Sequence, residues 1–152
     1  MKRELAGGYE LDDDPARVDV DAVHDFLANS YWAKGRPRDV VERHVREAAR
    51  VVGVYKRTEG QDESSPSGSS WSQVGYARAF SDGVALVYLA DVYILDEHRG
   101  RGLGVELVRE MVENSELTHV KWMLHTRDAH DLYRRFGFGE PGERVMERRP
   151  SA

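Results

Sequence analysis

The sequence contains no cysteine among its 152 residues. Without cysteine there is no disulfide framework, no cysteine-based zinc site and no thiol nucleophile, so an acyl-cysteine intermediate is excluded. The chain also lacks any run of the roughly 20 apolar residues that a membrane span requires. Its first eight residues have no apolar centre of the kind found in signal peptides. We therefore expect a cytoplasmic protein with no membrane partner.

Length, charge and histidine spacing restrict the possibilities further. A chain of this length with 40% hydrophobic residues has the size of one core, so we expect a single domain over residues 1–152. The formal net charge of −5 argues against nucleic acid as a partner. The six histidines show no short metal-ligand spacing, so we expect no metal site.

Hydrophobic periodicity and turn residues predict strands and helices in a definite order. Strands are expected at residues 9–11, 50–55, 73–80, 85–95, 119–126 and 144–147, with 73–80 and 85–95 forming a hairpin. Helices are expected at residues 19–29, from Pro37 to about Ala48, at 102–114 and at 128–136. The polar, serine-rich segment 56–72 is interpreted as a flexible loop, and a plain linker is favoured over a functional role. This order predicts an α+β fold around a mixed sheet.

The stretch from His98 to Gly104, His-Arg-Gly-Arg-Gly-Leu-Gly, is the most informative in the chain. It joins an apolar run, 86–95, to an amphipathic segment, 105–113, which indicates the order strand, glycine-rich turn, helix. Glycines let the backbone approach a ligand closely, and a helix start offers unpaired N–H groups and a partial positive charge. We therefore expect a phosphorylated ligand at this turn.

Two common phosphate-binding motifs do not fit these residues. A Walker A loop needs Lys followed by Ser or Thr after its last glycine, whereas Gly104 is followed by Val105. A dinucleotide fingerprint that begins at Gly100 would need its third glycine where Val105 stands. The pattern that remains is Arg99-x-x-Gly102-x-Gly104 after a hydrophobic strand.

This pattern is similar to the pyrophosphate loop of the GNAT acetyltransferase superfamily, R/Q-x-x-G-x-G/A. The later segment Asp128–Phe138 resembles that superfamily's A-x-x-L-Y-x-x-x-G-F motif, and the two motifs occur in the superfamily's order. The resemblance covers residues 9–148. It implies the GNAT fold, which is an α+β arrangement with a mixed central β-sheet of about six to seven strands flanked by about four helices.

The resemblance also implies acetyl-CoA as the co-substrate and assigns residues to it. Val92, Tyr93 and Ile94 match the strand whose backbone pairs with pantetheine. The loop that binds pyrophosphate through its backbone comprises Arg99, Gly100, Arg101, Gly102, Leu103 and Gly104; one of the two arginines is expected to be solvated surface only. Many members have an asparagine where this chain has Thr126, whose hydroxyl could replace part of that contact.

The implied reaction is direct acetyl transfer to a primary amine of a small molecule or peptide. Tyr133 matches the superfamily's tyrosine near the thioester sulfur, where a phenol can protonate a thiolate; by itself, Tyr133 reads as a core residue of an amphipathic helix. An amine like that of lysine has a pKa of about 10.4, so reaching its neutral form at pH 7.4 costs roughly 4 kcal/mol. Because a thiol pKa is near 8.5, the general acid is the easier role to lose.

Asp91 lies within an otherwise apolar strand, where a carboxylate is costly unless it is paired or faces a polar cleft. Burial would raise its pKa toward a value useful for a general base. Asp91 is therefore a candidate for the base or for an anchor of the substrate ammonium group. The alternative is an ion pair with a nearby arginine such as Arg78. His125, His130 and Asp128 are the other candidates for the base.

Tyr31 and Trp32 lie where the resemblance places the cover of the acceptor site, and we assign Tyr93 to the same site. Exposed aromatic rings can bind an amine through cation–π contact, or they can pack under the loop. The net-acidic chain mildly favours a small cationic acceptor. Residues 30–37 resemble a small bacterial subgroup that indicates no particular acceptor. The alternative function is a non-catalytic CoA-binding regulatory module, and the resemblance is compatible with a homodimer.

Overall fold

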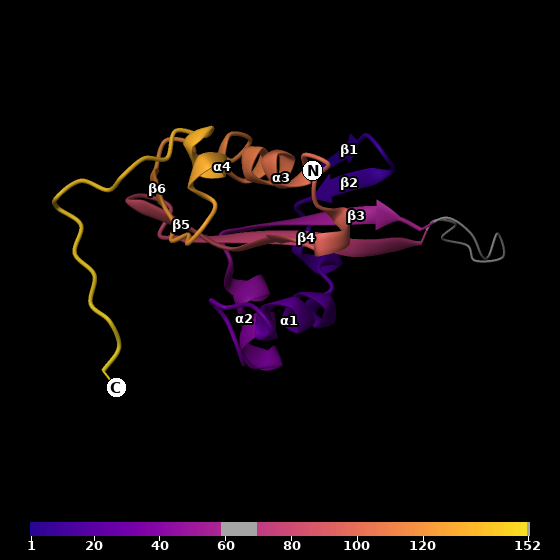
Figure 1. Ribbon diagram of the computed structural model, residues 1–152, viewed down its shortest axis with the longest axis horizontal. Helices are drawn as coiled ribbons and strands as arrows, with labels where there is room; N and C mark the ends of the chain where they lie inside the picture. Colours follow the sequence, from indigo (N-terminus) through magenta and orange to yellow (C-terminus); the bar gives the residue numbers. More distant parts are fainter. Residues whose placement is uncertain (59–69, 152) are drawn as a thin grey trace.

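The computed structural model describes residues 1–58 and 70–151, and within them a six-stranded sheet lies between two helical layers (Figure 1). Neighbouring strands are antiparallel except for the last pair, which is parallel. The predicted mixed sheet is therefore confirmed. In sheet order the strands are β1 (Lys2–Leu5), β2 (Tyr9–Asp12), β3 (Arg50–Arg57), β4 (Trp71–Ser81), β5 (Leu86–Ile94) and β6 (Lys121–Met123).

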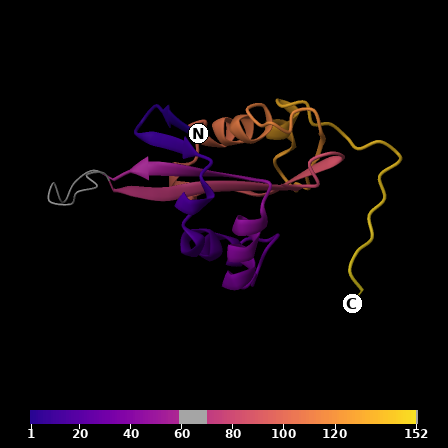
Figure 2. The ribbon, with the colours of Figure 1, turned by 180° about the vertical axis from the view of Figure 1, so that it is seen from behind.

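Helices cover both faces of the sheet (Figures 1 and 2). One face carries α1 (Val20–Ala28) and α2 (Arg38–Glu47), and the other carries α3 (Leu103–Val112) and α4 (His130–Arg134). Each helical layer has its own apolar cluster. Val23, Leu27 and Val41 belong to the cluster on the side of α1 and α2, and Leu107, Val108 and Met111 belong to the cluster on the side of α3. The predicted α+β class with four helices is confirmed for the described residues.

Local side chains explain where the first helices begin. Asp19 accepts a hydrogen bond from the backbone N–H of Ala22 at 3.0 Å and so caps α1. Asp14 accepts from the N–H of Ala16 at 2.9 Å and starts a short 3-10 turn, Pro15–Arg17. Pro37 comes directly before α2, as its fixed φ predicts.

Strand β1 is not among the predicted strands, because its residues, Lys-Arg-Glu-Leu, include one apolar side chain and show no alternation. Charged contacts hold it instead. Arg3 forms ion pairs with Glu106 at 2.7 Å and with Glu110 at 3.1 Å, both on α3. The pair Gly7–Gly8 is the feature of the sequence that could have indicated a hairpin here, since its φ angles of 80° and 74° form the turn from β1 into β2.

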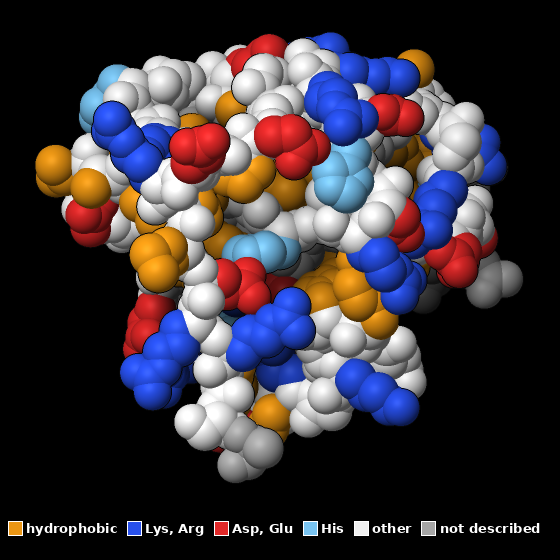
Figure 3. Space-filling model, turned by 60° about the vertical axis from the view of Figure 1, so that its left-hand side comes forward, with side chains coloured by type: hydrophobic (Ala, Val, Ile, Leu, Met, Phe, Trp, Pro, Cys, Tyr) orange, Lys and Arg blue, Asp and Glu red, His pale blue; other side chains and the backbone are white. Residues whose placement is uncertain are grey.

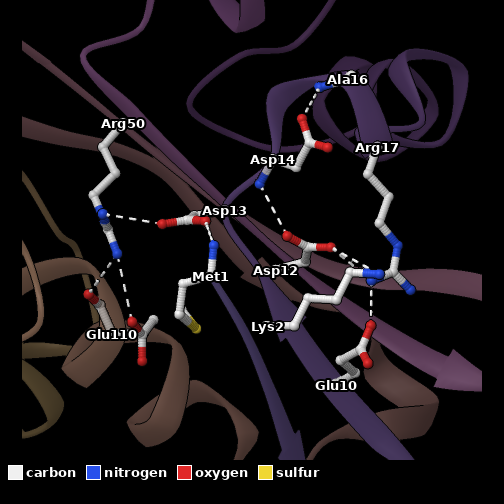
Figure 4. Close-up of polar contacts among 10 residues, drawn as sticks. All are labelled: Met1, Lys2, Glu10, Asp12, Asp13, Asp14, Ala16, Arg17, Arg50 and Glu110. Carbon is white, nitrogen blue, oxygen red and sulfur yellow. Dashed lines mark hydrogen bonds and ion pairs between the residues drawn. The ribbon is translucent and has the colours of Figure 1, made fainter.

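Further ion pairs fix the start of the chain to the rest of the sheet (Figure 4). Arg50 of β3 lies between Asp13 at 3.3 Å and Glu110 at 3.4 Å. Arg17 binds the carboxylate of Asp12 at 2.8 Å, and the pKa of Asp12 is lowered because this pairing outweighs the effect of burial. These contacts join β2, β3 and α3 into one unit.

The predicted strand at 144–147 is wrong, since the described chain after α4 forms no strand and runs outside the two layers (Figure 1). Val145 and Met146 are 47% and 94% exposed, so this charged segment buries too little apolar surface to offset the cost of ordering a strand. Other predicted segments have different bounds, most of all 119–126, which is a strand only at 121–123, and 128–136, which is a helix only at 130–134. The two ends of the predicted loop 56–72 belong to strands β3 and β4. Residues 59–69 of that loop lie outside the described residues.

Candidate active site

A cleft opens where β5 and β6 part. The two strands pair only through Leu86–Tyr88 and Lys121–Met123, and β6 then ends whereas β5 continues to Ile94. The cleft has a volume of about 1200 Å³ and is lined by β5, the α1–α2 connection, the glycine turn and residues 125–133. Figure 3 shows the molecule with its β6 and α4 end turned forward; this face is hollowed, and histidine, acidic and basic side chains border the hollow.

The backbone of β5 is irregular at Asp91, inside the cleft. Asp91 has a φ of 55°, and no other described non-glycine residue has a positive φ. The register with β4 shifts here, since Ala90 lies opposite Arg78 but Tyr93 lies opposite Tyr76, which leaves one extra residue in β5. A bulge of this kind interrupts the ladder and redirects side chains, and it turns the Asp91 carboxylate toward the cleft.

The Asp91 carboxylate is held by three side chains. Arg78 donates from Nε to Oδ2 at 2.5 Å, and Arg36 donates from Nη1 to the same oxygen at 2.8 Å. The indole N–H of Trp32 donates to Oδ1 at 3.0 Å. The ion pair with Arg78, which was the alternative interpretation of Asp91, is therefore confirmed, and Arg36 is a second cation that sequence reasoning missed.

The expectation that burial raises the pKa of Asp91 is wrong. Burial acts in that direction, but the charges of Arg78 and Arg36 and the hydrogen bonds from Arg78 and Trp32 outweigh it, so the pKa of Asp91 is lowered. A carboxylate held ionised by two guanidinium groups is a weak proton acceptor, and three of its four lone-pair sites already accept hydrogen bonds. The geometry therefore favours a structural role for Asp91 over the role of general base or ammonium anchor.

The glycine turn has the backbone expected of an anion site. Gly100 and Gly102 have φ angles of 76° and 77°, which L side chains rarely adopt, and Gly102 directly precedes α3. A Cβ atom added at Gly100, Gly102 or Gly104 would meet no described atom within 4 Å, so open space faces all three. The N–H groups at the start of α3 therefore have room for a phosphate.

The other residues predicted for this end of the cleft differ in their exposure and in whether they line the cleft. Arg99 lines the cleft, donates from Nε to the carbonyl of Ile94 at 3.1 Å and pairs with Asp96 at 3.2 Å, whereas Arg101 is exposed and does not line it. Leu103 is buried beneath the turn. Thr126 lines the cleft, and its hydroxyl accepts from the N–H of Ala129 at 3.0 Å, which starts the turn into α4.

Tyr133 lies on α4 and is 8% exposed, and its ring is edge-on to that of Phe138, with ring centroids 5.8 Å apart. Tyr133 lines the cleft, and no group of residues 1–58 and 70–151 forms a hydrogen bond with its hydroxyl. Burial raises the pKa of Tyr133 to about 12, so the phenol keeps its proton throughout the neutral pH range. A protonated hydroxyl without a partner, facing a cleft, is available to donate to a ligand.

Aromatic rings form one wall of the cleft. Phe26 of α1 stacks on Tyr93 of β5 with centroids 3.8 Å apart and an interplanar angle of 9°. Trp32 lies 6.0 Å from Phe26, and Tyr31 packs edge-on to Trp32 at 5.0 Å. Tyr31 and Trp32 are 51% and 39% exposed and line the cleft, and acceptor binding by these rings stays a prediction.

A hydrogen-bonded series of three side chains lies at the β6 end of the cleft. The hydroxyl of Tyr88 contacts Nδ1 of His125, and Nε2 of His125 lies 3.0 Å from a carboxylate oxygen of Glu147. Tyr88 and His125 both line the cleft. The sequence analysis named His125 as a candidate for the base, but it did not identify Tyr88 and Glu147 as its partners. Sequence spacing gives no sign that β5, residue 125 and the C-terminal segment meet.

Thirteen of the fourteen residues predicted for the site line this one cleft, and the exception is Arg101; Asp128 also lines it, whereas His130 is exposed and does not. In the described ranges no three His, Asp or Glu side chains are grouped so that they could hold a metal ion. Nor does any helix of those ranges have the length and apolar character needed to cross a membrane.

Comparisons with known proteins agree with this geometry. Residues 68–140 match the family model of the acetyltransferase (GNAT) domain. A crystal structure of a putative acetyltransferase of the GNAT family from Xanthomonas campestris pv. campestris superposes with a TM-score of 0.78 at 31% identity, covering 93% of each chain. A putative acetyltransferase from Deinococcus radiodurans superposes with a TM-score of 0.64 at 20% identity, covering 97% of this chain and 94% of the other, which shows the fold alone. The chain belongs to the GNAT acetyltransferase family.

One curated relative is a putative acetyltransferase of Gibberella zeae. It is 37% identical over an alignment of 105 residues, which covers 64% of this chain. The match spans only 59% of the length of that relative.

Proposed function

We propose that this protein is an acetyl-CoA-dependent N-acetyltransferase that moves the acetyl group directly to a primary amine of a small molecule or peptide. The observation that carries the proposal is the Tyr133 hydroxyl, which has no hydrogen-bond partner among the described residues, in a cleft that also contains the glycine turn. A phosphate site alone would serve a binding module as well. A proton donor in the same cleft is what a leaving thiolate requires.

The fit of the co-substrate rests on the glycine turn. The open space at Gly100, Gly102 and Gly104 lets the backbone approach a pyrophosphate, and Arg99 adds positive charge beside it. The backbone of Val92, Tyr93 and Ile94 lies past the end of β6, where its N–H and C=O groups on that side have no strand partner among the described residues. When bound, acetyl-CoA supplies the acetyl group as an activated thioester.

In this proposal Tyr133 is the general acid. Its O–H donates to the sulfur as the carbon–sulfur bond breaks, so the thiolate charge does not build up in a cleft lined partly by apolar rings. The pKa of about 12 keeps the Tyr133 hydroxyl protonated at working pH. Because a group with this pKa is a weak acid, it donates effectively only to a sulfur that is nearby and well aligned.

Proton removal from the amine is assigned to His125 acting through Tyr88. If Nε2–H of His125 donates to Glu147, then Nδ1 carries the lone pair that accepts from the Tyr88 hydroxyl. The Tyr88 oxygen takes a proton from the attacking amine as its own proton passes to Nδ1, and the Glu147 carboxylate stabilises the imidazolium that forms. Asp91 is not the base in this scheme; it orients Trp32 and the two arginines.

The test is to incubate the purified protein with acetyl-CoA and a panel of amines and to follow the release of free thiol. Transfer that falls in Tyr133→Phe while the acetyl-CoA affinity by titration calorimetry is unchanged supports the enzyme. The alternative is a regulatory CoA-binding module. Tight acetyl-CoA binding with no transfer to any amine in the panel would establish that alternative and reject the enzyme.

A further inference from the structure

The part of the cleft formed by the α1–α2 connection, β4, Asp91 and residues 125–127 carries more positive than negative charge. Arg36, Arg78 and Arg127 line it, against two acidic residues, Asp91 and, directly after Arg127, Asp128. Guanidinium groups do not lose their proton in proteins. The local charge therefore has the opposite sign to the net charge of the whole chain, which is −5.

Asp91 neutralises only one of the two arginines that contact it. Arg78 uses its Nε and Arg36 uses Nη1, both on the same carboxylate oxygen. Within the described part of the chain, the Nη groups of Arg78 and the Nε and Nη2 of Arg36 make no hydrogen bond. The two side chains are only 9% and 18% exposed, so water does little to stabilise the excess cation.

The charges of the two arginines also act on His44 of α2. The pKa of His44 is lowered, first by burial and then by the charges of Arg78 and Arg36. The Nδ1 atom of His44 is buried and has no hydrogen-bond partner in the part of the chain that the structure describes. A neutral histidine at this position is what a locally positive potential requires.

Arg127 adds a third cation at the mouth of the cleft. Its guanidinium carbon lies 3.9 Å from the centre of the Tyr31 ring, which fixes the side chain by cation–π contact. No ion pair joins Arg127 to any acidic residue within the described ranges. An arginine held on an aromatic ring with its donors free is suited to a planar anion.

Building on the proposed function, we infer that the acceptor is a primary amine that also carries a carboxylate, as in an amino acid or the C-terminal end of a short peptide. The free donors of Arg36, Arg78 and Arg127 bind the carboxylate, and the amine then points toward Tyr88. This acceptor differs from the cationic one that the net charge favours, because binding depends on the charges that line the cleft.

Arg36 and Arg78, which lie at Asp91, also assist the reaction at the amine. Positive charges near an ammonium group disfavour it relative to the neutral amine. A purely cationic amine would meet this repulsion without compensation. An amine with a carboxylate brings its own counter-charge, so its affinity is retained while its proton is easier to remove.

The first test compares acceptors in sets of three: a carboxylated amine, its carboxamide and the same amine without the carboxyl group. Transfer is followed by thiol release at saturating acetyl-CoA. We expect kcat/KM to be about 10- to 100-fold higher for the carboxylated member, as is typical of a charge-assisted contact. Equal kcat/KM within each set, or a preference for the uncharged or cationic member, overturns the inference while leaving the proposed function in place.

The second test uses Arg127→Gln, with Arg135→Gln as a control of equal charge change at an exposed residue outside the cleft. Arg127→Gln should raise KM for the carboxylated acceptor about 10-fold with little change in kcat, and should leave the carboxamide unaffected. The control should change neither constant. A KM for the carboxylated acceptor that is unchanged in Arg127→Gln, or raised equally for both acceptors, contradicts the assignment. Failure of every amine to react would instead reject the function and the inference together.

Discussion

Arg78 of β4 donates its Nε–H to the carboxylate of Asp91 on β5 across 2.5 Å, at the point where β5 carries an extra residue. The contact joins the two strands of the hairpin where their ladder is interrupted. It also turns a costly buried carboxylate into one half of an ion pair. The irregular backbone of the cleft and the charge of its inner wall thus depend on the same pair.

The first prediction concerns stability. Asp91→Asn leaves Arg78 and Arg36 without their counter-ion, and loss of one partner of a buried ion pair costs about 3 kcal/mol or more. Chemical denaturation at pH 7 should show this loss. Asp131→Asn, at an exposed carboxylate that pairs with Arg134 on α4, is the control and should cost less than about 1 kcal/mol.

The pH dependence of that loss follows from the lowered pKa of Asp91. Because the folded-state pKa lies below the unfolded value of about 3.9, the ion pair stabilises the fold above that value. The stabilisation is lost as pH falls through the folded pKa. The difference between wild type and Asp91→Asn should therefore be full at pH 6 to 7 and shrink in strong acid. A difference that grows on acidification would contradict the ion-pair account.

A second prediction uses kinetics to separate a structural role of Asp91 from a basic one. If Asp91 took the amine proton, Asp91→Asn would lose more activity near pH 7 than at pH 9 to 10, where more amine is already neutral. Since two arginines hold Asp91 ionised, we expect the fractional loss to be the same across this range. A loss confined to neutral pH would restore Asp91 as the base, provided that the acetyl-CoA affinity is unchanged.

The third prediction tests the anion site. Gly102→Glu puts a side chain and a negative charge into the open space at the start of α3, and acetyl-CoA affinity should fall by ~100-fold or more. Gly83→Glu is a matched control, because Gly83 also has a φ of 77°, also faces open space, and lies outside the cleft. Titration calorimetry should find normal affinity in the control. Similar losses in both variants would indicate backbone strain and not a ligand site.

The fourth prediction concerns the Tyr133 hydroxyl. Tyr133→Phe should reduce kcat by roughly 10²-fold, the low end for a general acid, because a thiolate leaves readily. Since the pKa of Tyr133 is about 12, wild-type activity should show no loss of this donor between pH 8 and 10. Tyr76→Phe removes another buried hydroxyl, one that has no hydrogen-bond partner among the described residues and does not line the cleft, and should leave kcat unchanged. Wild-type kcat in Tyr133→Phe would refute its role.

The parts of the site that sequence predicts are those encoded locally. The glycine turn from Gly100 to Gly104 is recognisable because positive φ angles need glycine, and the hairpin of β4 and β5 is recognisable because two apolar runs flank a short polar turn. Both features are complete within a few neighbouring residues. Their prediction therefore requires no knowledge of how distant segments pack.

What sequence did not predict depends on distant segments meeting. Arg36 and Arg127 enter the cleft from the α1–α2 connection and from the residues after β6, and nothing in their spacing relates them to Asp91. The pKa of Asp91 was misjudged because the pairing with Arg78, the largest cause of the lowering, was only the alternative interpretation, and Arg36 was not foreseen at all. The strand predicted at 144–147 was wrong for the opposite reason. Its local pattern is suitable for a strand, but the segment has no apolar surface to pack against.

The last prediction tests the route of the amine proton. His125→Gln removes the group that accepts from the Tyr88 hydroxyl, and kcat near pH 7 should fall by roughly 10²-fold, the low end for a general base. The loss should shrink toward pH 9 to 10, where a larger share of the amine is neutral before it binds. Glu147→Gln should give a smaller loss of the same pH dependence, since it removes only the carboxylate that stabilises the imidazolium. His130→Gln is the matched control, because His130 is exposed on α4 outside the cleft and should have wild-type kcat at every pH. A loss in His125→Gln that does not vary with pH would mean that His125 only positions Tyr88, and an unchanged kcat would remove both residues from the proton route.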